Sequence, residues 1–391
     1  MKESPLKRVA LAQSNIIPGG GTEAVIAWMI QSLKKKNYQV TLITYSQVDV
    51  SEFNRYYGTS LNASEFTLVK VPLPPFFMAT RRLSILKDHL LMRYCKSMRD
   101  RFDLFISPSG VMDFGGRSIQ YVGLGPDSTL IKVMDNAPQS KPGYIRLKRW
   151  FMAACERLSG YSEESARNNV TMAPSIWAGD LIDRVFGLPD YKVVYPPVSA
   201  SQDQDVPATT WDSRTSGFLC VARLVPEKKI ENVIAVLKLV RERGFDVSLR
   251  IIGRQDDLVY AQEIRCMCED SGDWVTLDDV LERRELLPLM TQYRYGIHGA
   301  LDEPFGIAVA EMVKFGCIVF VPNGGGQIEI VESPQLTFDD LEDGARKISA
   351  VLESPSLQSD LLDHLQKHTR SFSVEAFCES TQEIVKEIFR E

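Results

Sequence analysis

A glycine triplet, Gly19-Gly20-Gly21, separates a short apolar run at residues 8–13 from a segment with helical periodicity. Thr22 is expected to cap that helix. The apolar positions of one helix face are Val25, Trp28, Met29 and Leu33. A second apolar run follows at residues 40–44. This order of strand, loop, helix and strand is how doubly wound α/β domains begin, and it places the glycines at the carboxyl edge of a parallel sheet, where ligands bind.

The chain is long enough for two domains, because its 391 residues exceed the roughly 100 to 200 that one hydrophobic core usually serves. Residues 199–215 are polar and aperiodic, which predicts a linker. Short apolar runs alternate with helical patterns on both sides of it. The predicted parts are an α/β domain at 1–198, the linker at 199–215, a second α/β domain at 216–372 and an amphipathic closing helix at 373–391.

The composition is that of a soluble globular protein, with 44% hydrophobic and 25% charged residues. No apolar run approaches the ~18 residues that a membrane-spanning helix requires. The first eight residues are not followed by the apolar stretch of a signal peptide, so a cytoplasmic location is expected. Attachment to the cytoplasmic face of a membrane stays open.

The net charge of -6 is unevenly distributed. Residues 1–200 carry 25 basic and 17 acidic side chains, whereas residues 201–391 carry 20 and 34. The first half therefore has a net positive charge, and it is the half expected to meet an anionic surface.

Nothing in the sequence predicts a metal site or a bound cofactor. The seven cysteines are scattered, without a CxxC pair or a spacing shared with histidine. Asp203-Gln204-Asp205 resembles a metal-binding Asp-x-Asp pattern, but it lies in the predicted linker and not at the end of a strand. We expect free thiols and no metal ion.

Two carboxylates, Glu303 and Glu311, lie eight positions apart across a predicted junction of loop and helix, which Pro304 and Gly306 mark. A helix beginning near Gly306 would put Glu311 about 7 Å along its axis at ~1.5 Å per residue, with Glu303 before its positive end. Helix N-termini bind anions. The pattern therefore suits a nucleotide sugar, with the diphosphate at the helix, the sugar near Glu303 and the ribose hydroxyls bonded to Glu311.

Two cations and a second glycine group lie at other predicted strand ends. Arg223 and Lys228 follow the apolar run at 218–222 and could bind the same phosphates, although such residues are ordinarily surface charges. Gly324-Gly325-Gly326 allows close approach of backbone to a ligand, or forms a tight turn. His298 precedes the Glu303 loop, where a sugar contact and a buried structural role are both open.

These segments together resemble the retaining glycosyltransferases of family 4, and the resemblance covers nearly the whole chain. The matching segments are Gly19-Gly20-Gly21-Thr22-Glu23, Ala173-Pro174-Ser175, Val194-Tyr195-Pro196-Pro197-Val198, Arg223 with Lys228, and Glu303-Pro304-Phe305-Gly306-Ile307-Ala308-Val309-Ala310-Glu311. The last of these, with the upstream arginine and lysine, is the most specific.

The resemblance implies a GT-B fold, which is two Rossmann-like domains with an interdomain cleft, and a last helix that returns to the first domain. It implies that the first domain binds the acceptor and the second binds the nucleotide sugar. In that family Arg223 and Lys228 would stabilise the leaving diphosphate and Glu303 would lie near the transferred sugar, these three forming the catalytic set. The expected donor-binding residues are Gly20, Gly21, Val280, Phe305, Gly306, Ile307 and Glu311.

The expected activity is transfer of a hexose from a UDP- or GDP-linked donor to a glycan, a lipid-linked acceptor or a small molecule, without a metal. No separate cofactor and no nucleic-acid partner are expected. Two alternatives stay open, which are a sugar-nucleotide-binding protein without transferase activity and an isomerase on the same fold.

One position departs from the family pattern. Similar proteins often have a histidine where this chain has Gly123, in Tyr121-Val122-Gly123. That histidine would contact a hydroxyl of the donor sugar, so its absence bears on the identity of the sugar. Asp127 is a candidate substitute.

Residues 72–101 mix apolar residues with arginines and lysines, among them Arg81, Arg82 and Lys87. Such a segment could form a peripheral membrane contact or the groove for a lipid-linked acceptor. An ordinary helix with a core-facing stripe and a solvated basic face would have the same composition.

Overall fold

The computed structural model describes residues 6–16, 19–74, 77, 83–123, 142–198 and 209–390, and for residues 142–145 it describes the backbone alone. The chain divides into two compact units. The first unit comprises Met1–Pro197 with Val374–Glu391, and the second comprises Val198–Ser373. Each unit is built around its own parallel sheet.

The sheet of the first unit has seven parallel strands in the order β3-β2-β1-β4-β5-β6-β7. Ala10 of β1 lies opposite Thr41 of β2 on one side and Phe105 of β4 on the other. The order of strands reverses between β1 and β4, which is the doubly wound topology. The strands are β1 (Arg8–Ala12), β2 (Gln39–Thr44), β3 (Thr67–Lys70), β4 (Leu104–Ser107), β5 (Ile119–Tyr121), β6 (Val170–Ala173) and β7 (Tyr191–Val193).

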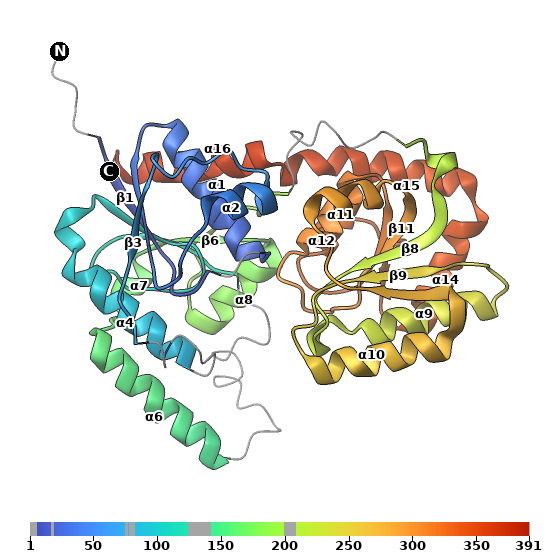
Figure 1. The fold of residues 1–391 in the computed structure, drawn as a ribbon, viewed down its shortest axis with the longest axis horizontal. Coiled ribbons are helices and arrows are strands. Elements are labelled where there is room, and N and C mark those ends of the chain that lie inside the picture. The colour runs from blue at the N-terminus through green and yellow to red at the C-terminus, as the bar shows by residue number, and fades with distance from the viewer. Residues whose placement is uncertain are drawn as a thin grey trace. The chain divides into compact units, whose positions relative to one another are not determined.

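Helices cover this sheet, and the last helix of the chain is one of them. α16 (Val374–Ile388) lies beside α1 (Gly21–Lys35), as Figure 1 shows. Ser32 of α1 donates from Oγ to the Cys378 carbonyl at 3.1 Å, and Gln382 donates from Nε2 to the Ser32 carbonyl at 3.0 Å. The other α-helices in the described part of this unit are α2 (Val50–Tyr57), α4 (Ser84–Ser97), α6 (Pro142–Ser159), α7 (Glu163–Arg167) and α8 (Ile176–Phe186).

The start of α1 differs from the prediction that Thr22 would cap the helix. The helix begins at Gly21, its N-cap is Gly20, and no side chain caps it. The Glu23 carboxylate folds back over Gly20, where a Cβ would overlap Oε2 of Glu23. The cap position is therefore held by a residue without a side chain, and Thr22 lies inside the first turn.

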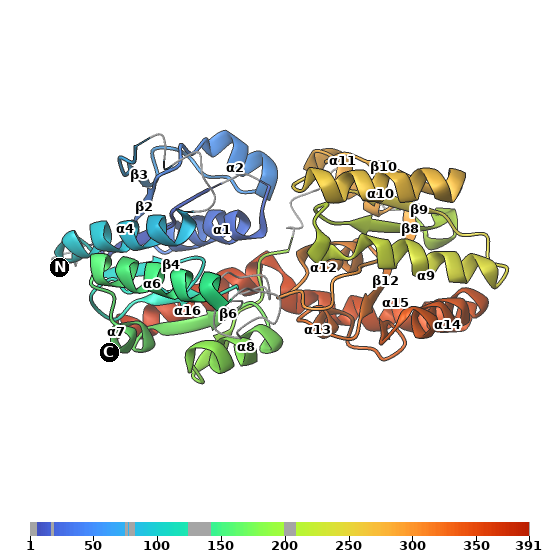
Figure 2. The ribbon, with the colours of Figure 1, turned by 90° about the horizontal axis from the view of Figure 1, so that it is seen from below.

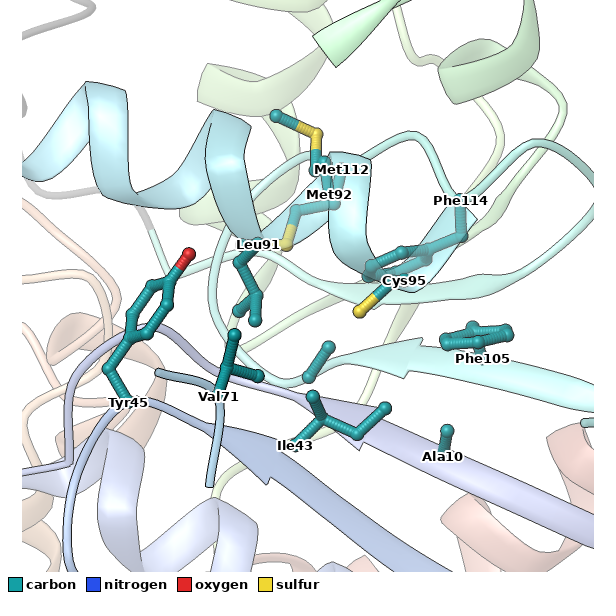
Figure 3. Packing of buried hydrophobic residues seen from close by; sticks show 11 residues of the cluster. Ala10, Ile43, Tyr45, Val71, Leu91, Met92, Cys95, Phe105, Met112 and Phe114 are labelled. Carbon is teal, nitrogen blue, oxygen red and sulfur yellow. The ribbon is translucent and has the colours of Figure 1, made fainter. Parts of the chain in front are cut away.

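One hydrophobic cluster of the first unit lies between α4 and the sheet. Leu91, Met92 and Cys95 of α4 point toward Ala10, Ile43 and Phe105 of the strands (Figure 3). Lys87 of the same helix is also buried. Leu91, Met92 and Cys95 thus form a core stripe on α4, whereas Leu83, Leu86 and Leu90 are only half-buried. Arg81 and Arg82 of the segment 72–101 lie outside the described residues.

The second unit has six parallel strands in the order β10-β9-β8-β11-β12-β13. The strands are β8 (Thr215–Val221), β9 (Leu249–Ile252), β10 (Val275–Asp278), β11 (Tyr293–Ile297), β12 (Ile318–Pro322) and β13 (Thr337–Phe338). The α-helices are α9 (Ile230–Glu242), α10 (Leu258–Ser271), α11 (Arg283–Met290), α12 (Ile307–Lys314), α13 (Ile328–Val331), α14 (Leu341–Glu353) and α15 (Pro355–His368). The reversal of strand order falls between β8 and β11.

The predicted linker at 199–215 extends too far toward the second unit. Residues 211–213 form a 3-10 helix, and β8 already begins at Thr215. The Thr215 amide donates to the Gln292 carbonyl at 2.7 Å. Backbone pairing with the β11 segment thus extends the strand beyond its apolar residues, which hydropathy alone cannot indicate. Residues 199–208 lie outside the described residues.

Candidate functional site

The candidate site lies at the carboxyl edge of the second sheet, on both sides of the point where strand order reverses. Arg223 and Lys228 follow β8, and His298 and Glu303 follow β11, the neighbouring strand. In doubly wound sheets this switch point is where ligands bind, because loops on its two sides diverge. Residues 75 positions apart in the sequence are thereby brought into contact.

Lys228 and Glu303 form an ion pair between Nζ and Oε2. Their side chains are only 16% and 17% exposed. The turn that carries Lys228 approaches the loop after β11 closely, since a Cβ on Gly299 would lie 2.7 Å from the Lys228 carbonyl oxygen. A glycine at 299 is therefore a condition for this approach.

The Glu303 carboxylate is stabilised as an anion. Burial alone would raise the pKa of Glu303, but the charge of Lys228 and its hydrogen bond, with a further contribution from Arg223, hold that pKa below its ordinary value. Glu303 is thus ionised at neutral pH, and Lys228 is the cation nearest to it.

Arg223 belongs to a second ionic group on the same edge. Its Nη1 lies 3.2 Å from Oδ2 of Asp256, and Nε of Arg254 lies 2.7 Å from Oδ1 of the same carboxylate. Asp256 is 9% exposed in its side chain, whereas Arg223 is 56% exposed. One nearly buried carboxylate therefore holds two guanidinium groups, and that of Arg223 stays accessible from solvent.

Helix α12 begins between the two predicted acids. Its N-cap, Gly306, has φ 98° and ψ 61°, a left-handed conformation that side chains rarely adopt. The positive end of the helix is thereby placed directly after the Glu303 loop. Glu311 lies on the same helix and is buried.

The Glu311 carboxylate accepts a hydrogen bond from Arg283 of α11, with Nη1 3.0 Å from Oε1. The two side chains are 9% and 18% exposed. Oε1 is thus committed to the protein, and the other carboxylate oxygen is the one through which Glu311 could accept from a ribose hydroxyl.

His298 is buried and bonded to Gln327, with Nδ1 2.9 Å from Oε1. Gln327 donates from Nε2 to the carbonyls of Ala300 at 2.5 Å and Gly324 at 3.2 Å. Because the amide nitrogen is committed to two acceptors, Oε1 must accept, which puts the imidazole proton on Nδ1. Burial first, and then the charge of Lys228, lower the pKa of His298 to about 4, so the ring is neutral at physiological pH.

The glycines after β12 approach protein backbone. A Cβ on Gly325 would lie 2.6 Å from the amide nitrogen and carbonyl oxygen of Glu303, and one on Gly324 would lie 2.8 Å from the Leu301 carbonyl oxygen. The Gly326 amide donates to the Glu303 carbonyl at 2.7 Å. The sequence predicts that these glycines allow close approach to a ligand. In the structure they approach the backbone of the Glu303 loop instead, and they hold that loop in place.

Three other predicted donor-binding residues differ in what they can offer. Phe305 is buried, with its ring 5.4 Å from that of Phe372, so its side chain faces the protein interior. Ile307 is the first residue of α12 and is half-buried, and its backbone amide belongs to the positive helix end. Val280 follows β10 and is 58% exposed, which leaves an apolar surface accessible.

Gly20 and Gly21 lie at the carboxyl edge of the first sheet, at the start of α1. The Gly19 amide donates to the Tyr57 hydroxyl at 2.8 Å. Glu23, also buried, brings a carboxylate to this helix end. Approach of these glycines to donor phosphates stays a prediction, and the neighbouring carboxylate would oppose it.

Gly123 is exposed after β5, and a Cβ added there would have no heavy atom within 4 Å. The residue therefore leaves open space where the family pattern has a histidine. Its candidate substitute Asp127, and Asp203 and Asp205, lie outside the described residues. Within the described ranges, no group of three or more histidine, cysteine or acidic side chains is arranged to hold a metal ion.

Sequence reasoning missed Asp256, Arg283 and Gln327, each of which bonds a predicted site residue. Asp256 follows β9 and Arg283 follows β10, and this position after a strand is the sequence feature that could have indicated them as site residues. Gln327 directly follows the glycine group. No local pattern indicates which site residue each of them contacts.

Comparison with known proteins points to one family for the second unit. Residues 201–370 match the family described as "Glycosyl transferases group 1". The match includes every residue of the site in the second unit.

Among curated proteins, the "GDP-Man:Man(3)GlcNAc(2)-PP-Dol alpha-1,2-mannosyltransferase" of Candida glabrata is 23% identical over 209 residues, which is 51% of this chain and 41% of that protein. The Homo sapiens protein of the same name is 28% identical over 152 residues, 36% of this chain and 31% of that one. Each match thus spans less than half of the relative.

Solved structures match nearly the whole chain. Sucrose-phosphate synthase from Thermosynechococcus elongatus has a TM-score of 0.73 and 14% identity, over 98% of this chain and 99% of that one. WaaG, a glycosyltransferase involved in lipopolysaccharide biosynthesis, has a TM-score of 0.71 and 15% identity, over 96% and 99%. The fold is GT-B. The predicted α/β architecture of two Rossmann-like domains is confirmed.

Proposed function

We propose that the protein is a retaining glycosyltransferase of family 4 that transfers a hexose from a UDP- or GDP-linked donor. The observation that carries the proposal is the contact of Lys228 with Glu303 at the switch point of the second sheet, beside Arg223 and before the N-terminus of α12. Cations, a positive helix end and a carboxylate are the groups that a sugar diphosphate requires.

The cations suit a leaving nucleoside diphosphate. Negative charge develops on the diphosphate as the bond to the sugar breaks, and preorganised cations stabilise that charge in the transition state. Arg223 is held by Asp256 and Lys228 by Glu303, so neither side chain must be ordered at the moment of reaction. A bound diphosphate would share Lys228 with Glu303, leaving that carboxylate next to the sugar.

The rest of the second-unit site suits the nucleoside. Glu311, fixed by Arg283, would accept hydrogen bonds from ribose hydroxyls. Exposed Val280 offers an apolar surface to the base. The charge of the diphosphate would be met by Arg223, Lys228 and the α12 N-terminus, so we propose that the reaction needs no metal ion.

The acceptor is proposed to be a glycan, a lipid-linked sugar or a small molecule bound by the first unit. The names of the curated relatives include a GDP-mannose donor and a dolichol-linked acceptor, and other structures with this fold contain UDP or UDP-glucose. These names support a nucleotide sugar as the donor class and a lipid-linked oligosaccharide as one acceptor class to test.

The direct test begins with thermal-shift screening against a panel of UDP- and GDP-sugars, followed by donor hydrolysis and transfer assays with the best ligand. Hydrogen bonds to charged groups contribute roughly 1.5 to 3 kcal/mol, so Arg223→Ala and Lys228→Ala should each lower kcat/KM about ten- to a hundredfold. Glu303→Gln should lower kcat with nucleotide affinity nearly intact. NMR of the product should show the donor's anomeric configuration retained, and activity should survive EDTA.

Matched controls are available beside each residue. Lys229→Ala removes a cation adjacent to Lys228, and Asp302→Asn removes an exposed acid adjacent to Glu303; both should keep wild-type turnover. Wild-type turnover in folded Arg223→Ala and Glu303→Gln would refute the proposed site. Binding of a nucleotide sugar without hydrolysis or transfer would instead support the nontransferring alternative, and an isomerised donor would support the isomerase.

A further inference from the structure

Helix α6 exposes large apolar side chains together with arginines. Trp150 is 70% exposed and Leu147 is 64% exposed, and Leu158, three turns after Leu147, is 39% exposed. Trp150 is the most exposed of the large apolar residues in the first unit's described part. Burial of such side chains is favourable, so a patch of this kind in a folded protein suggests a contact surface.

The opposite face of α6 packs on α4, as Figures 1 and 2 both show. Cys155 and Ser159 are buried there, and Ser159 Oγ lies 2.8 Å from Nδ1 of His89 on α4. Arg93 of α4 donates to the Leu158 carbonyl at 3.2 Å. The helix is therefore fixed to the unit by one face, and its other face is presented outward.

The outward face is basic as well as apolar. Three arginines on it are exposed, and they are Arg146, Arg149 and Arg157. Arg146, Trp150 and Arg157 recur at helical spacing, so the tryptophan lies between two guanidinium groups along the same face. The described acidic residue of α6, Glu156, is only half-exposed, next to buried Cys155.

We propose that this face of α6, defined by Arg146, Leu147, Arg149, Trp150, Arg157 and Leu158, binds the surface of an anionic phospholipid bilayer. Tryptophan favours the boundary between headgroups and acyl chains, leucines enter the apolar side of that boundary, and arginines attract anionic headgroups. The charge of the whole first half of the chain has the same sign, with 25 basic and 17 acidic side chains in residues 1–200.

The contact is thereby assigned to α6 and not to α4. Leu91 and Met92 of α4 are buried in the unit (Figure 3) and cannot reach a bilayer without unfolding it. Lys87 of the same helix is buried as well. The α6 residues, in contrast, can do so with the fold intact. This inference does not depend on the proposed transferase chemistry.

The test is sedimentation of the full chain with phosphatidylcholine vesicles, with and without phosphatidylglycerol. The wild-type protein should bind only the anionic vesicles, and salt should weaken that binding. Each arginine near an anionic surface contributes about a fivefold factor in affinity, so the triple variant Arg146→Glu/Arg149→Glu/Arg157→Glu should lose at least about a hundredfold. Leu147→Ala/Trp150→Ala should lose about tenfold or more.

The charge control is Lys238→Glu/Arg265→Glu/Lys386→Glu, which changes the net charge equally at exposed residues of other helices. The apolar control is Leu258→Ala/Val259→Ala on α10, where the two side chains are 75% and 72% exposed beside acidic residues. Both controls should keep most of the binding. Circular dichroism should show all variants folded.

Insertion of Trp150 into the bilayer gives a second measurement of the proposed contact. Quenching of tryptophan fluorescence by brominated lipid should be strong in the wild-type protein and should fall in Trp150→Phe. Equal binding to neutral vesicles, loss of binding in the controls as large as in the α6 variants, or binding to an oligonucleotide but not to vesicles would each overturn the proposal. Donor hydrolysis by the α6 variants should match the wild-type rate, which separates this outcome from failure of the proposed function.

Discussion

Arg283 and Glu311 form a nearly buried ion pair, with Nη1 of Arg283 3.0 Å from Oε1 of Glu311. The two residues come from different helices, α11 and α12, that follow strands on opposite sides of the switch point. The pair therefore ties the Glu311 end of the candidate site to both halves of the second sheet.

Removal of one partner should affect stability as well as binding. Arg283→Ala leaves the Glu311 carboxylate buried without this cation, and the cost should be about 2 kcal/mol in the free energy of unfolding, somewhat below that of a fully buried pair. UDP or GDP affinity should fall with it, because Glu311 loses its orientation. Chemical denaturation and calorimetric titration measure the two effects.

The double variant Arg283→Met/Glu311→Gln separates these effects. It leaves no unpaired charge, so much of the stability should return while nucleotide affinity stays low. Recovery of nucleotide affinity in the double variant would show that Glu311 does not bind the ribose.

Asp256 is expected to act through Arg223. Asp256→Asn keeps the shape of the side chain but removes the charge that holds the Arg223 and Arg254 guanidinium groups. The expected result is a fall in kcat/KM of about tenfold, carried mainly by kcat, because the orientation of a cation toward the leaving group is lost.

A double-mutant cycle distinguishes positioning from a general structural role. In the Arg223→Ala background, Asp256→Asn should have little further effect on turnover. Independent, multiplying losses in the two single variants would contradict the coupling. Asp257→Asn is a poor control because Asp257 caps α10, whereas Asp246→Asn on an exposed turn is a suitable one.

The pH dependence of stability should report His298. Burial, with the charge of Lys228, lowers the pKa of His298 to about 4, well below its value in the unfolded chain. As the pH falls below about 6.5 the unfolded chain binds a proton that the folded one does not, so the free energy of unfolding falls, by about 3 kcal/mol for this histidine at pH 4.

His89 and Asp88 titrate in the same pH window, and their effects on the free energy of unfolding must be separated from that of His298. Burial lowers the pKa of His89 to about 4, which adds a second loss of the same sign. Burial raises the pKa of Asp88 to about 6, against the hydrogen bond from Ser14, and proton uptake by the folded state there opposes the loss. Urea denaturation from pH 7 to 4.5 should therefore be compared between wild type and His298→Asn, which retains a donor for Gln327.

The slope of unfolding free energy against pH should be smaller in His298→Asn by up to one proton, with no difference between the slopes above pH 7. Parallel curves throughout would show that His298 titrates in the folded protein as it does in the unfolded chain. Activity should not follow this window through Glu303, because its lowered pKa keeps it ionised.

The sequence predicts strand ends better than it predicts contacts between them. Arg223, Lys228 and Glu303 could be selected because each follows an apolar run or a junction of loop and helix, which are local features. The partners Asp256 and Arg283 depend on the order of β8, β9 and β10 in the sheet, which no local pattern encodes. Gln327 similarly reaches His298 only because β11 and β12 are neighbours.

Predictions were wrong or stayed open where two physical causes give one pattern. Threonine before a helix is a usual cap, but the folded-back Glu23 carboxylate favours Gly20 at that position. The apolar residues of segment 72–101 suit a core and a bilayer equally, and burial assigns Leu91 and Met92 to the core. The segment with exposed apolar residues, α6, has a basic and apolar composition similar to that of 72–101, so composition could not separate them.

Gly123 offers a test of how the donor sugar is selected. The residue is exposed at the carboxyl end of β5 and does not need a left-handed conformation, and a Cβ added there would meet open space, so Gly123→His should fold with a melting temperature close to that of the wild type. The family resemblance implies that a histidine there contacts a hydroxyl of the donor sugar. Relative kcat/KM between donors that differ at one hydroxyl should change by about tenfold, a typical effect of one hydrogen bond. Nucleotide affinity should stay the same, since the added side chain belongs to the first unit and the nucleoside residues to the second.

Gly123→Ala is the matched control for loss of glycine alone. A uniform change for every donor sugar would mean that the position affects folding or dynamics and not the choice of sugar.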